Sequence, residues 1–184
     1  MEKSAIRAEM RRLKAACSPK ERDALSRAVI ARLEATPQWQ QAKTVLLYHS
    51  LPDEVATHDL IRRATTIGKR VLLPVVEGDD LLLRSYQPSD ELHEGAFHIF
   101  EPTGETFTDY AAIDLAVIPG VAFTPDGFRL GRGRGYYDRL LPHLIATCKI
   151  GICWPFQLLS ELPTEPHDVR MDAVITIVET PPIC

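Results

Sequence analysis

The apolar positions near the start of the chain follow a helical pattern. Residues 2–16 carry apolar side chains at helical spacing, at Ile6, Met10 and Leu13. The basic residues of this segment lie off that stripe: Lys3, Arg7, Arg11 and Lys14. The pattern therefore predicts an amphipathic helix with one buried side and one charged side.

Further helices are indicated by the residues at their ends. Ser18-Pro19-Lys20-Glu21 is a capping box with proline at the first helical position, so a second helix is expected from Ser18. A third helix is predicted over about 57–66, where Gly68 ends it. Residues 136–147 also favour a helix, although Pro142 lies inside this segment.

Short apolar runs predict strands. They occupy residues 44–48, 70–76, 81–86, 114–119, 149–153 and 173–178. Residues 77–80 are expected to form the four-residue loop of a hairpin, and residues 87–112 to form long loops. Because strands alternate with helices, the sequence predicts one α/β domain over 1–184, with a mostly parallel sheet between two helical layers.

Composition narrows the class of protein. The chain has 184 residues, of which 45% are hydrophobic and 25% charged, as in ordinary globular proteins. Its net charge of -4 disfavours a general polyanion binder, so any phosphate site must be local. The four cysteines form no Cys-x-x-Cys pair, the longest apolar runs are strand-length, and the first residues do not resemble a secretory signal. We therefore expect a cytoplasmic protein that does not associate with membranes.

The most informative segment is a glycine loop between a predicted strand and a predicted helix. Glycines alternate along it, at Gly131, Gly133 and Gly135. Such a loop can turn several backbone N–H groups toward a phosphate, and the helix that follows adds its own N–H groups. Its arginines are suited to phosphate: Arg129, Arg132 and Arg134. Asp138, one turn further on, could hold a magnesium ion that the phosphates share.

Known phosphate-binding patterns do not match this loop. The P-loop motif is absent, and Tyr136 occupies the third glycine position of the dinucleotide pattern. A flexible, solvated Gly/Arg loop is one alternative. An RNA-binding Arg-Gly segment is another, which the acidic composition and the position between regular elements disfavour.

The segment Arg129-Leu130-Gly131-Arg132-Gly133-Arg134-Gly135-Tyr136-Tyr137-Asp138, after Pro119-Gly120-Val121-Ala122-Phe123, resembles the signature of the 5-formyltetrahydrofolate cyclo-ligase family. The resemblance extends over nearly the whole chain. Lys3 and Arg7 are similar to the family's Lys-x-x-x-Arg start, and residues 50–57 to the segment where a Glu faces the folate. Residues 162–172 are similar to the family's carboxy-terminal motif.

The resemblance implies an activity and a fold. The expected reaction is the ATP- and Mg²⁺-dependent conversion of 5-formyltetrahydrofolate to 5,10-methenyltetrahydrofolate, with release of ADP and phosphate, through a phosphorylated formyl (imidate) intermediate. The expected fold is similar to that of the sugar-phosphate isomerase and coenzyme A transferase group. The expected partners are the folate and ATP, with no nucleic acid, and the protein is expected to be a monomer.

The resemblance also implies roles for individual residues. ATP contacts are expected at Lys3, Arg7, Arg129, Gly131, Arg132, Gly133, Arg134, Gly135, Tyr136 and Tyr137. Folate contacts are expected at His49, Glu54, Arg132, Gly133, Arg134, Gly135 and Tyr136. The chemical step is assigned to Arg134 and Tyr136, and the Mg²⁺ ion to Asp138 and Asp168.

Several alternatives stay open. Asp172 competes with Asp168 for the metal, and His49 stands where the family contacts its substrate with an apolar side chain. Lys3 and Arg7 also fit a solvated helix face. Rival functions are an ATP-dependent enzyme with another acceptor and a non-catalytic module that binds nucleotide or folate.

Overall fold

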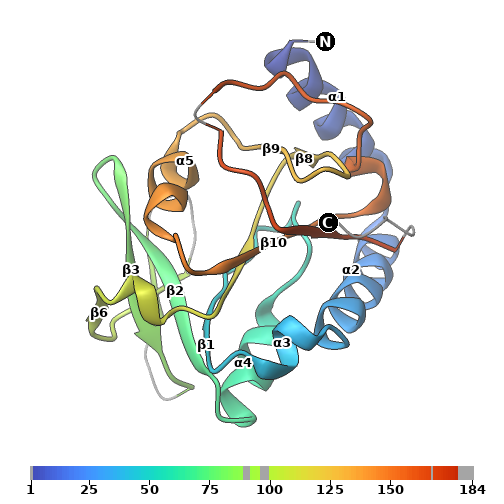
Figure 1. Cartoon of the computed structure of the whole chain (residues 1–184). Helices are drawn as coiled ribbons and strands as arrows, with labels where there is room; N and C mark the ends of the chain where they lie inside the picture. Colours follow the sequence, from blue (N-terminus) through green and yellow to red (C-terminus); the bar gives the residue numbers. More distant parts are fainter. Residues whose placement is uncertain (1, 89–91, 96–99, 167, 178–184) are drawn as a thin grey trace.

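The computed structural model describes residues 2–88, 92–95, 100–166 and 168–177. Among them, the main sheet has seven strands in the order β11-β10-β7-β1-β2-β3-β6 (Figure 1). The strands are β1 (Thr44–Leu46), β2 (Arg70–Glu77), β3 (Asp80–Tyr86), β6 (Thr106–Phe107), β7 (Leu115–Ile118), β10 (Cys148–Ile152) and β11 (Ala173–Ile175). All pairs from β11 to β2 are parallel, and β3 and β6 extend the sheet antiparallel. The predicted α/β class with a mostly parallel sheet is confirmed.

Helices cover both faces of this sheet. The helices among the described residues are α1 (Lys3–Ala16), α2 (Pro19–Glu34), α3 (Pro37–Gln41), α4 (His58–Thr66) and α5 (Tyr136–Leu140), with the short 3-10 helices η2 (Tyr110–Ala112), η3 (Leu141–His143) and η4 (Pro155–Gln157). The predicted capping box opens α2: the Ser18 side chain accepts from the Glu21 N–H, and the Glu21 side chain accepts from the Ser18 N–H. α2, α3 and α4 lie on one side of the sheet and α5 on the other (Figure 1).

Successive strand residues enter different cores. Val45 and Leu47 pack against α2, α3 and α4, whereas Leu46 between them packs toward α5 and η3. Because neighbouring side chains of a strand point to opposite faces, both faces of the central strands must be apolar, which explains their lack of polar alternation. The result is the expected three-layer α/β/α arrangement.

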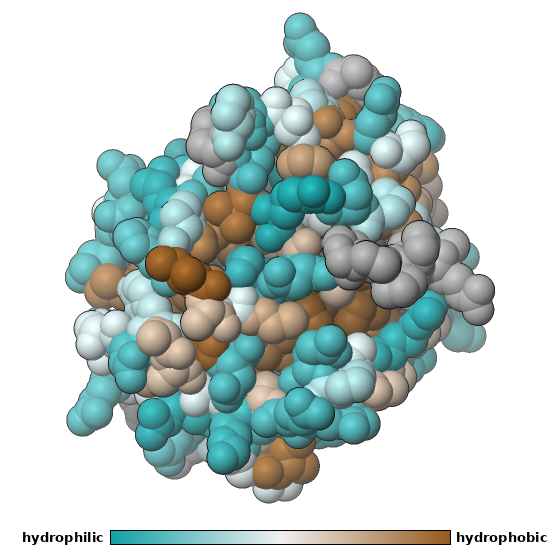
Figure 2. All heavy atoms as spheres, viewed as in Figure 1, coloured by the Kyte–Doolittle hydropathy of each residue, from teal (hydrophilic) through white to brown (hydrophobic). Residues whose placement is uncertain are grey.

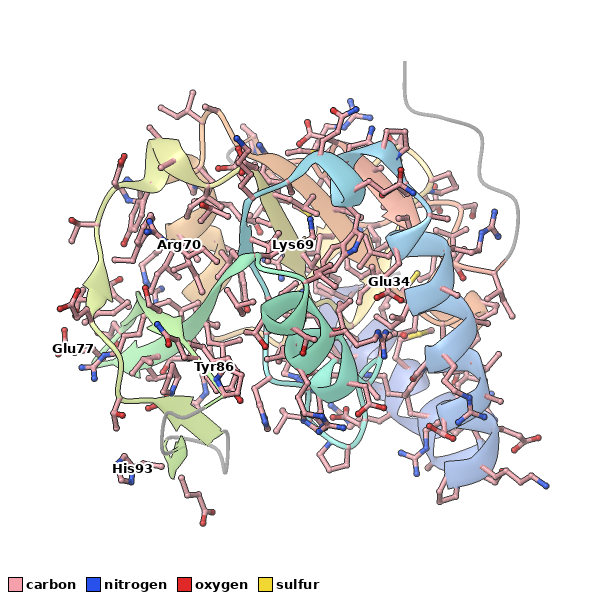
Figure 3. The ribbon with its side chains drawn as sticks, turned by 90° about the horizontal axis from the view of Figure 1, so that it is seen from below. Glu34, Lys69, Arg70, Glu77, Tyr86 and His93 are labelled. Atoms are coloured by element: carbon pink, nitrogen blue, oxygen red, sulfur yellow. The ribbon has the colours of Figure 1, made fainter. Side chains whose placement is uncertain are left out.

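The helical layer is also tied together by charges. Glu34 of α2 pairs with Arg63 of α4 at 3.0 Å, and Figure 3 shows Glu34 from below. Lys69, just before β2, donates to the Trp39 carbonyl of α3 at 2.7 Å. The surface in Figure 2 is mostly hydrophilic, with small hydrophobic areas between polar ones. Within the described part of the chain, no helix is long and apolar enough to cross a membrane.

Four details correct the sequence predictions. The helix predicted over 136–147 ends at Leu140, because Pro142 has no N–H and the chain tightens into η3. The hairpin of β2 and β3 extends to a Glu77–Asp80 pair, so its loop has two residues and not four; Gly78, with φ of 60°, suits such a turn.

The other two corrections concern the loops and the first helix. Residues 87–112 contain β4 (Leu92–Glu94), β5 (Phe100–Pro102) and β6 as well as loops, while 89–91 and 96–99 lie outside the described residues. A separate two-stranded sheet joins β8 (Ala122–Phe123) to β9 (Arg129–Leu130), on which α1 packs. Lys14, placed off the apolar stripe of α1, is instead buried together with Ile6 and Met10.

Candidate active site

A pocket of about 320 Å³ opens at the carboxyl ends of the central strands. Its walls are residues 48–54 after β1, the β2–β3 hairpin, residues 119–120 after β7, and residues 129–138. The chain continues from β1 to β2 on one side of β1, and β7 lies on the other side, which makes this edge a topological switch point. Open α/β sheets bind ligands at such points, and the volume is in the range of small-molecule sites.

The glycine loop forms one wall of this pocket. Gly133 and Gly135 have φ of 98° and 74°, a left-handed region that side chains rarely adopt. A Cβ on Gly135 would lie 2.6 Å from Nη1 of Arg139, and Gly135 itself caps α5. Local backbone demands therefore explain these two glycines, and the loop they form faces the cavity.

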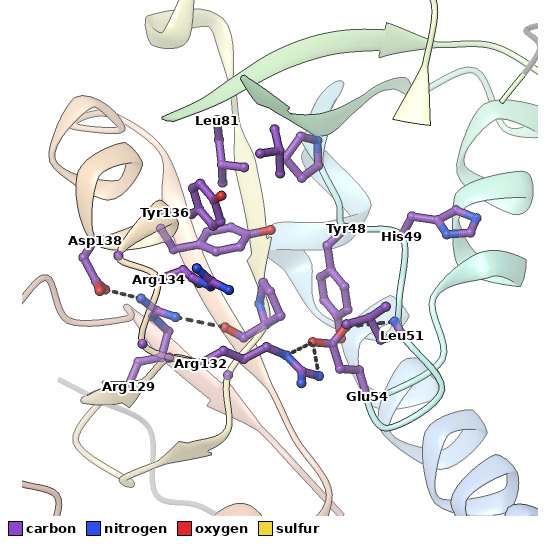
Figure 4. Close-up of a pocket in the computed structure, with 18 of the residues that line it drawn as sticks. Tyr48, His49, Leu51, Glu54, Leu81, Arg129, Arg132, Arg134, Tyr136 and Asp138 are labelled. Atoms are coloured by element: carbon purple, nitrogen blue, oxygen red, sulfur yellow. Dashed lines mark hydrogen bonds and ion pairs between the residues drawn. The ribbon is translucent and has the colours of Figure 1, made fainter. Parts of the chain in front are cut away.

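Arg129 and Asp138 form a buried pair on the glycine-loop side. The Arg129 side chain is 5% exposed, pairs with the Asp138 carboxylate and lies over the Tyr137 ring at 5.6 Å. Burial lowers the pKa of Arg129, and the charge of Asp138 opposes this shift. Figure 4 shows the pair at one side of the pocket, with Asp138 half exposed.

Arg132 and Glu54 meet on the opposite side. Arg132 donates from Nε and Nη2 to Oε1 of Glu54, at 3.1 and 2.9 Å, and from Nη2 to Oδ1 of Asp53 at 2.6 Å (Figure 4). The other Glu54 oxygen accepts from the Leu51 N–H at 3.0 Å, which fixes a carboxylate that is 12% exposed. Burial alone would raise the pKa of Asp53, but hydrogen bonding by Arg132 and the charge of Lys14 lower it.

Arg134, Tyr136 and Tyr137 lie between these two sides. All three line the cavity, and in Figure 4 Arg134 and Tyr136 stand between Asp138 and Glu54. The Tyr136 hydroxyl donates to the Gly78 carbonyl at 3.5 Å, and Arg139 lies over its ring. Burial raises the pKa of the Tyr137 hydroxyl above its ordinary value. Both tyrosines also pack against the core of the α5 face.

Lys3 and Arg7 approach the pocket from α1. Arg7 Nε donates to the Gly131 carbonyl at 2.9 Å, and its guanidinium would lie 3.4 Å from a Cβ on Gly133. Lys3 pairs with Glu165 at 2.6 Å, on the carboxy-terminal loop. Because positions 3, 7 and 14 lie within about 40° of each other around a helix, we call Lys3, Arg7 and Lys14 the basic edge of α1. Lys3 and Arg7 border the glycine loop and the carboxy-terminal loop but do not line the cavity itself.

The two candidate metal ligands lie around Arg129. Asp138 lines the cavity, whereas Asp168 does not; Asp168 accepts from the Glu165 N–H at 2.7 Å and its charge acts on Arg129. Asp172 instead accepts from the Lys149 N–H at 2.6 Å, near the amino end of β10 and away from the pocket. The described residues hold no group of three or more His, Cys, Asp or Glu arranged for a metal. Two carboxylates are nevertheless a suitable donor set for Mg²⁺, which usually keeps waters and phosphate oxygens as its other ligands.

His49 borders the pocket in a neutral state. Burial lowers its pKa to about 4, and the neighbouring His58 acts in the same direction. The two rings are tilted with centroids 4.2 Å apart, and His58 contacts the Ser50 carbonyl through Nε2 at 3.1 Å. A neutral imidazole is compatible with the folate contact expected at this position.

Sequence reasoning missed part of the site. Tyr48 ends a strand that was predicted, so its place beside Glu54 follows once the strand is aligned. Glu101 lines the cavity from β5, in a segment predicted as loop, and holds the Val76 N–H at 3.0 Å. No pattern in the sequence indicates that contact, because it depends on how β5 packs against β2 and β3. The sequence also gives no sign that Asp53 contacts Arg132, or that Lys14 contacts Asp53.

Comparison with known proteins gives a consistent result. The model of the 5-formyltetrahydrofolate cyclo-ligase family matches residues 1–177. The 5-formyltetrahydrofolate cyclo-ligase of Escherichia coli K12 is 32% identical over 174 residues, covering 91% of this chain and 96% of that protein. The mouse protein of the same name is 28% identical and covers 94% of this chain and 92% of its own length.

Solved structures resemble the fold over its full extent. The structure of 5,10-methenyltetrahydrofolate synthetase from Aquifex aeolicus has a TM-score of 0.88 and 34% sequence identity, covering 100% of this chain and 93% of that chain. The corresponding synthetase from Mycoplasma pneumoniae has a TM-score of 0.78 and 28% identity, covering 96% and 99%.

Proposed function

Because the chain belongs to the 5-formyltetrahydrofolate cyclo-ligase family, we propose that its pocket binds 5-formyltetrahydrofolate on the Glu54 side and ATP on the glycine-loop side. The protein is a ligase that converts 5-formyltetrahydrofolate to 5,10-methenyltetrahydrofolate with ATP. One observation carries the assignment of sides: a single cavity has the loop with Arg129 and Asp138 at one wall and a fixed carboxylate, Glu54, at the other.

The chemistry assigned to each side follows from its donors. Glu54 can accept a hydrogen bond from an N–H group of a pterin ring, because a carboxylate has about four acceptor sites and Arg132 and the Leu51 N–H fill three of them. The glycine loop and its arginines face the nucleotide, with Lys3 and Arg7 bordering the loop from α1. Arg132, Arg134 and the loop glycines border both substrates, and Tyr136 and Tyr137 close the pocket beside them.

The proposed reaction has two steps. The formyl oxygen takes the γ-phosphoryl group of ATP, which releases ADP and leaves a phosphorylated imidate. N10 of the folate then bonds to the formyl carbon and loses its proton, the carbon–oxygen bond breaks, and phosphate leaves. Phosphoryl transfer depends mainly on positioning and charge neutralisation, so we assign Arg134 to the charge on the transferred group and Tyr136 to its orientation.

Asp138 and Asp168 are the residues that would hold Mg²⁺, which supplies charge neutralisation between the phosphates when bound. The charges of both carboxylates act on Arg129, so the two side chains lie near one another, which supports this assignment. The engagement of Asp172 by Lys149 disfavours the competing one. In the ligand-free protein the Arg129 guanidinium balances the carboxylate of Asp138.

The Asp138→Asn variant should need more Mg²⁺. Removing one carboxylate ligand is expected to raise the Mg²⁺ concentration for half-maximal activity about tenfold, at saturating ATP and folate. A Mg²⁺ titration of initial rates measures this. Asp126→Asn, which loses an exposed ion pair with Arg170 outside the pocket, is the matched control and should titrate as the unaltered protein does. An unchanged midpoint in Asp138→Asn would remove Asp138 from the metal site.

The reaction itself is tested by near-ultraviolet absorbance. Purified protein mixed with 5-formyltetrahydrofolate, ATP and Mg²⁺ should produce the methenyl chromophore, and omission of ATP should abolish its growth. Absence of the chromophore from folded protein that still binds ATP would point to a different acceptor. We further propose that the protein acts as a monomer of one domain, with no nucleic acid involved.

A further inference from the structure

Lys14 is a buried cation next to the pocket that the proposed reaction does not use. It continues the buried positions Ile6 and Met10 of α1 and is 5% exposed. Its Nζ donates to Oδ2 of Asp53 at 3.3 Å and lies 6.0 Å from the centre of the Trp154 ring. Burial lowers the pKa of Lys14, and the charge of Asp53 opposes the shift. Burying an ammonium group without a compensating partner lowers the stability of the fold, so a buried lysine on the apolar stripe suggests a specific role.

Asp53 connects Lys14 to the binding pocket. One carboxylate oxygen of Asp53 accepts from Lys14, and the other accepts from Nη2 of Arg132 at 2.6 Å. Arg132 also donates to Glu54. These contacts form an ion network of alternating charge: Lys14, Asp53, Arg132 and Glu54. Each of the two inner residues, Asp53 and Arg132, bonds to two partners of opposite charge.

The bond from Lys14 to one oxygen of Asp53 affects where Arg132 lies. Two carboxylates, those of Asp53 and Glu54, accept hydrogen bonds from the Arg132 guanidinium. If Arg132 bonded to both oxygens of Asp53, this bidentate pair would move it away from Glu54. Lys14 occupies the Asp53 oxygen that such a pair requires. With Lys14 in place, Arg132 keeps its bonds to Oε1 of Glu54, and the Leu51 N–H holds the other oxygen.

We propose that Lys14 is a positioning residue for folate binding: it holds Asp53 so that Arg132 stays bonded to Glu54 and fixes the direction in which Glu54 faces the folate. This role rests on the proposed function, in which Glu54 contacts the pterin. It distinguishes Lys14 from Lys149, a second buried lysine, whose Nζ donates to the Leu144 and Thr147 carbonyls near the amino end of β10. Lys149 thus provides a matched structural comparison.

The first measurement is folate affinity without ATP. Lys14→Met keeps the methylenes against Trp154 and removes the charge, and it should weaken the dissociation constant for 5-formyltetrahydrofolate about tenfold by calorimetry. Lys149→Met should lower the melting temperature and leave that constant within twofold. Equal folate affinities of the Lys14→Met and unaltered proteins would overturn the proposal. An unaltered protein that binds no folate would refute the proposed function itself, and this role of Lys14 with it.

Combination with Arg132→Ala separates positioning from loss of stability. If Lys14 acts through Arg132, Lys14→Met should change folate affinity less than twofold in the Arg132→Ala background, whereas independent effects multiply. A tenfold loss in both backgrounds would contradict the proposal. If Lys14→Met does not fold, Asp53→Asn tests the same contact, since Asp53 is partly exposed. The effect of Asp53→Asn on folate affinity should also vanish in the Arg132→Ala background. An effect that persists in that background would overturn the proposal.

Discussion

Replacing Arg134 by alanine is expected to lower kcat/KM for ATP by a factor of about one hundred to one thousand. Loss of one donor that faces developing charge in a water-poor site typically costs this much. Arg134 lines the cavity between Asp138 and Glu54, where the proposed mechanism places the transferred phosphoryl group (Figure 4). Folate affinity should change much less, by less than about threefold, since Glu54 and Arg132 are intact.

Steady-state kinetics with ATP varied at saturating folate will measure the effect of Arg134→Ala. Arg62→Ala, which removes an arginine paired with Asp59 on α4, is the control for loss of a surface arginine and should retain activity. Arg134→Lys should recover part of the loss, because a lysine supplies charge without the planar fork. An unchanged KM and kcat for ATP in Arg134→Ala would remove Arg134 from the nucleotide side.

Glu54→Gln should weaken folate binding and leave ATP binding nearly unchanged, the reverse of Arg134→Ala. We expect the KM for 5-formyltetrahydrofolate to rise about tenfold to one hundredfold, because hydrogen bonds to a charged group are stronger than neutral ones and the amide cannot accept at both atoms. ATP affinity should stay within about twofold. The change is nearly isosteric, so the volume of the pocket is preserved and the folded structure should persist.

The control for Glu54→Gln is the same substitution at a glutamate outside the pocket. Glu34→Gln removes a carboxylate that also pairs with an arginine, but on the outer helical layer (Figure 3), and its folate KM should not move. Equal losses of folate and ATP affinity in Glu54→Gln would mean that Glu54 acts on the whole pocket through Arg132. It would then not be a folate contact.

The glycine loop could be located from the sequence because its requirements are local. Gly133 and Gly135 need left-handed backbone, and alternating glycine and arginine between a strand and a helix indicate a phosphate site whatever the rest of the fold. The sheet could be predicted for a similar reason, since buried parallel strands are continuous apolar runs. Both features are encoded within a few consecutive residues.

Features that depend on distant packing were not predictable in this way. Glu101 reaches the pocket because β5 packs against the β2–β3 hairpin. Lys14 is buried and pairs with Asp53, which lies 39 positions later in the chain. The basic residues of α1 look alike in sequence, yet Lys14 is enclosed while Arg11 is exposed. The early end of α5 shows the same limit, since a proline after one turn outweighs a favourable helical pattern.

The basic edge of α1 has a consequence for how the enzyme is made. α1 leaves the ribosome before the segments it contacts, since Arg7 contacts a residue 124 positions later and Lys3 contacts one 162 positions later. Chains emerge amino terminus first, and such distant contacts form only after the intervening loop has closed. The proposed nucleotide side of the pocket therefore gains its Lys3 contact only after Glu165 has been synthesised, so a growing chain that has not reached Glu165 lacks this contact.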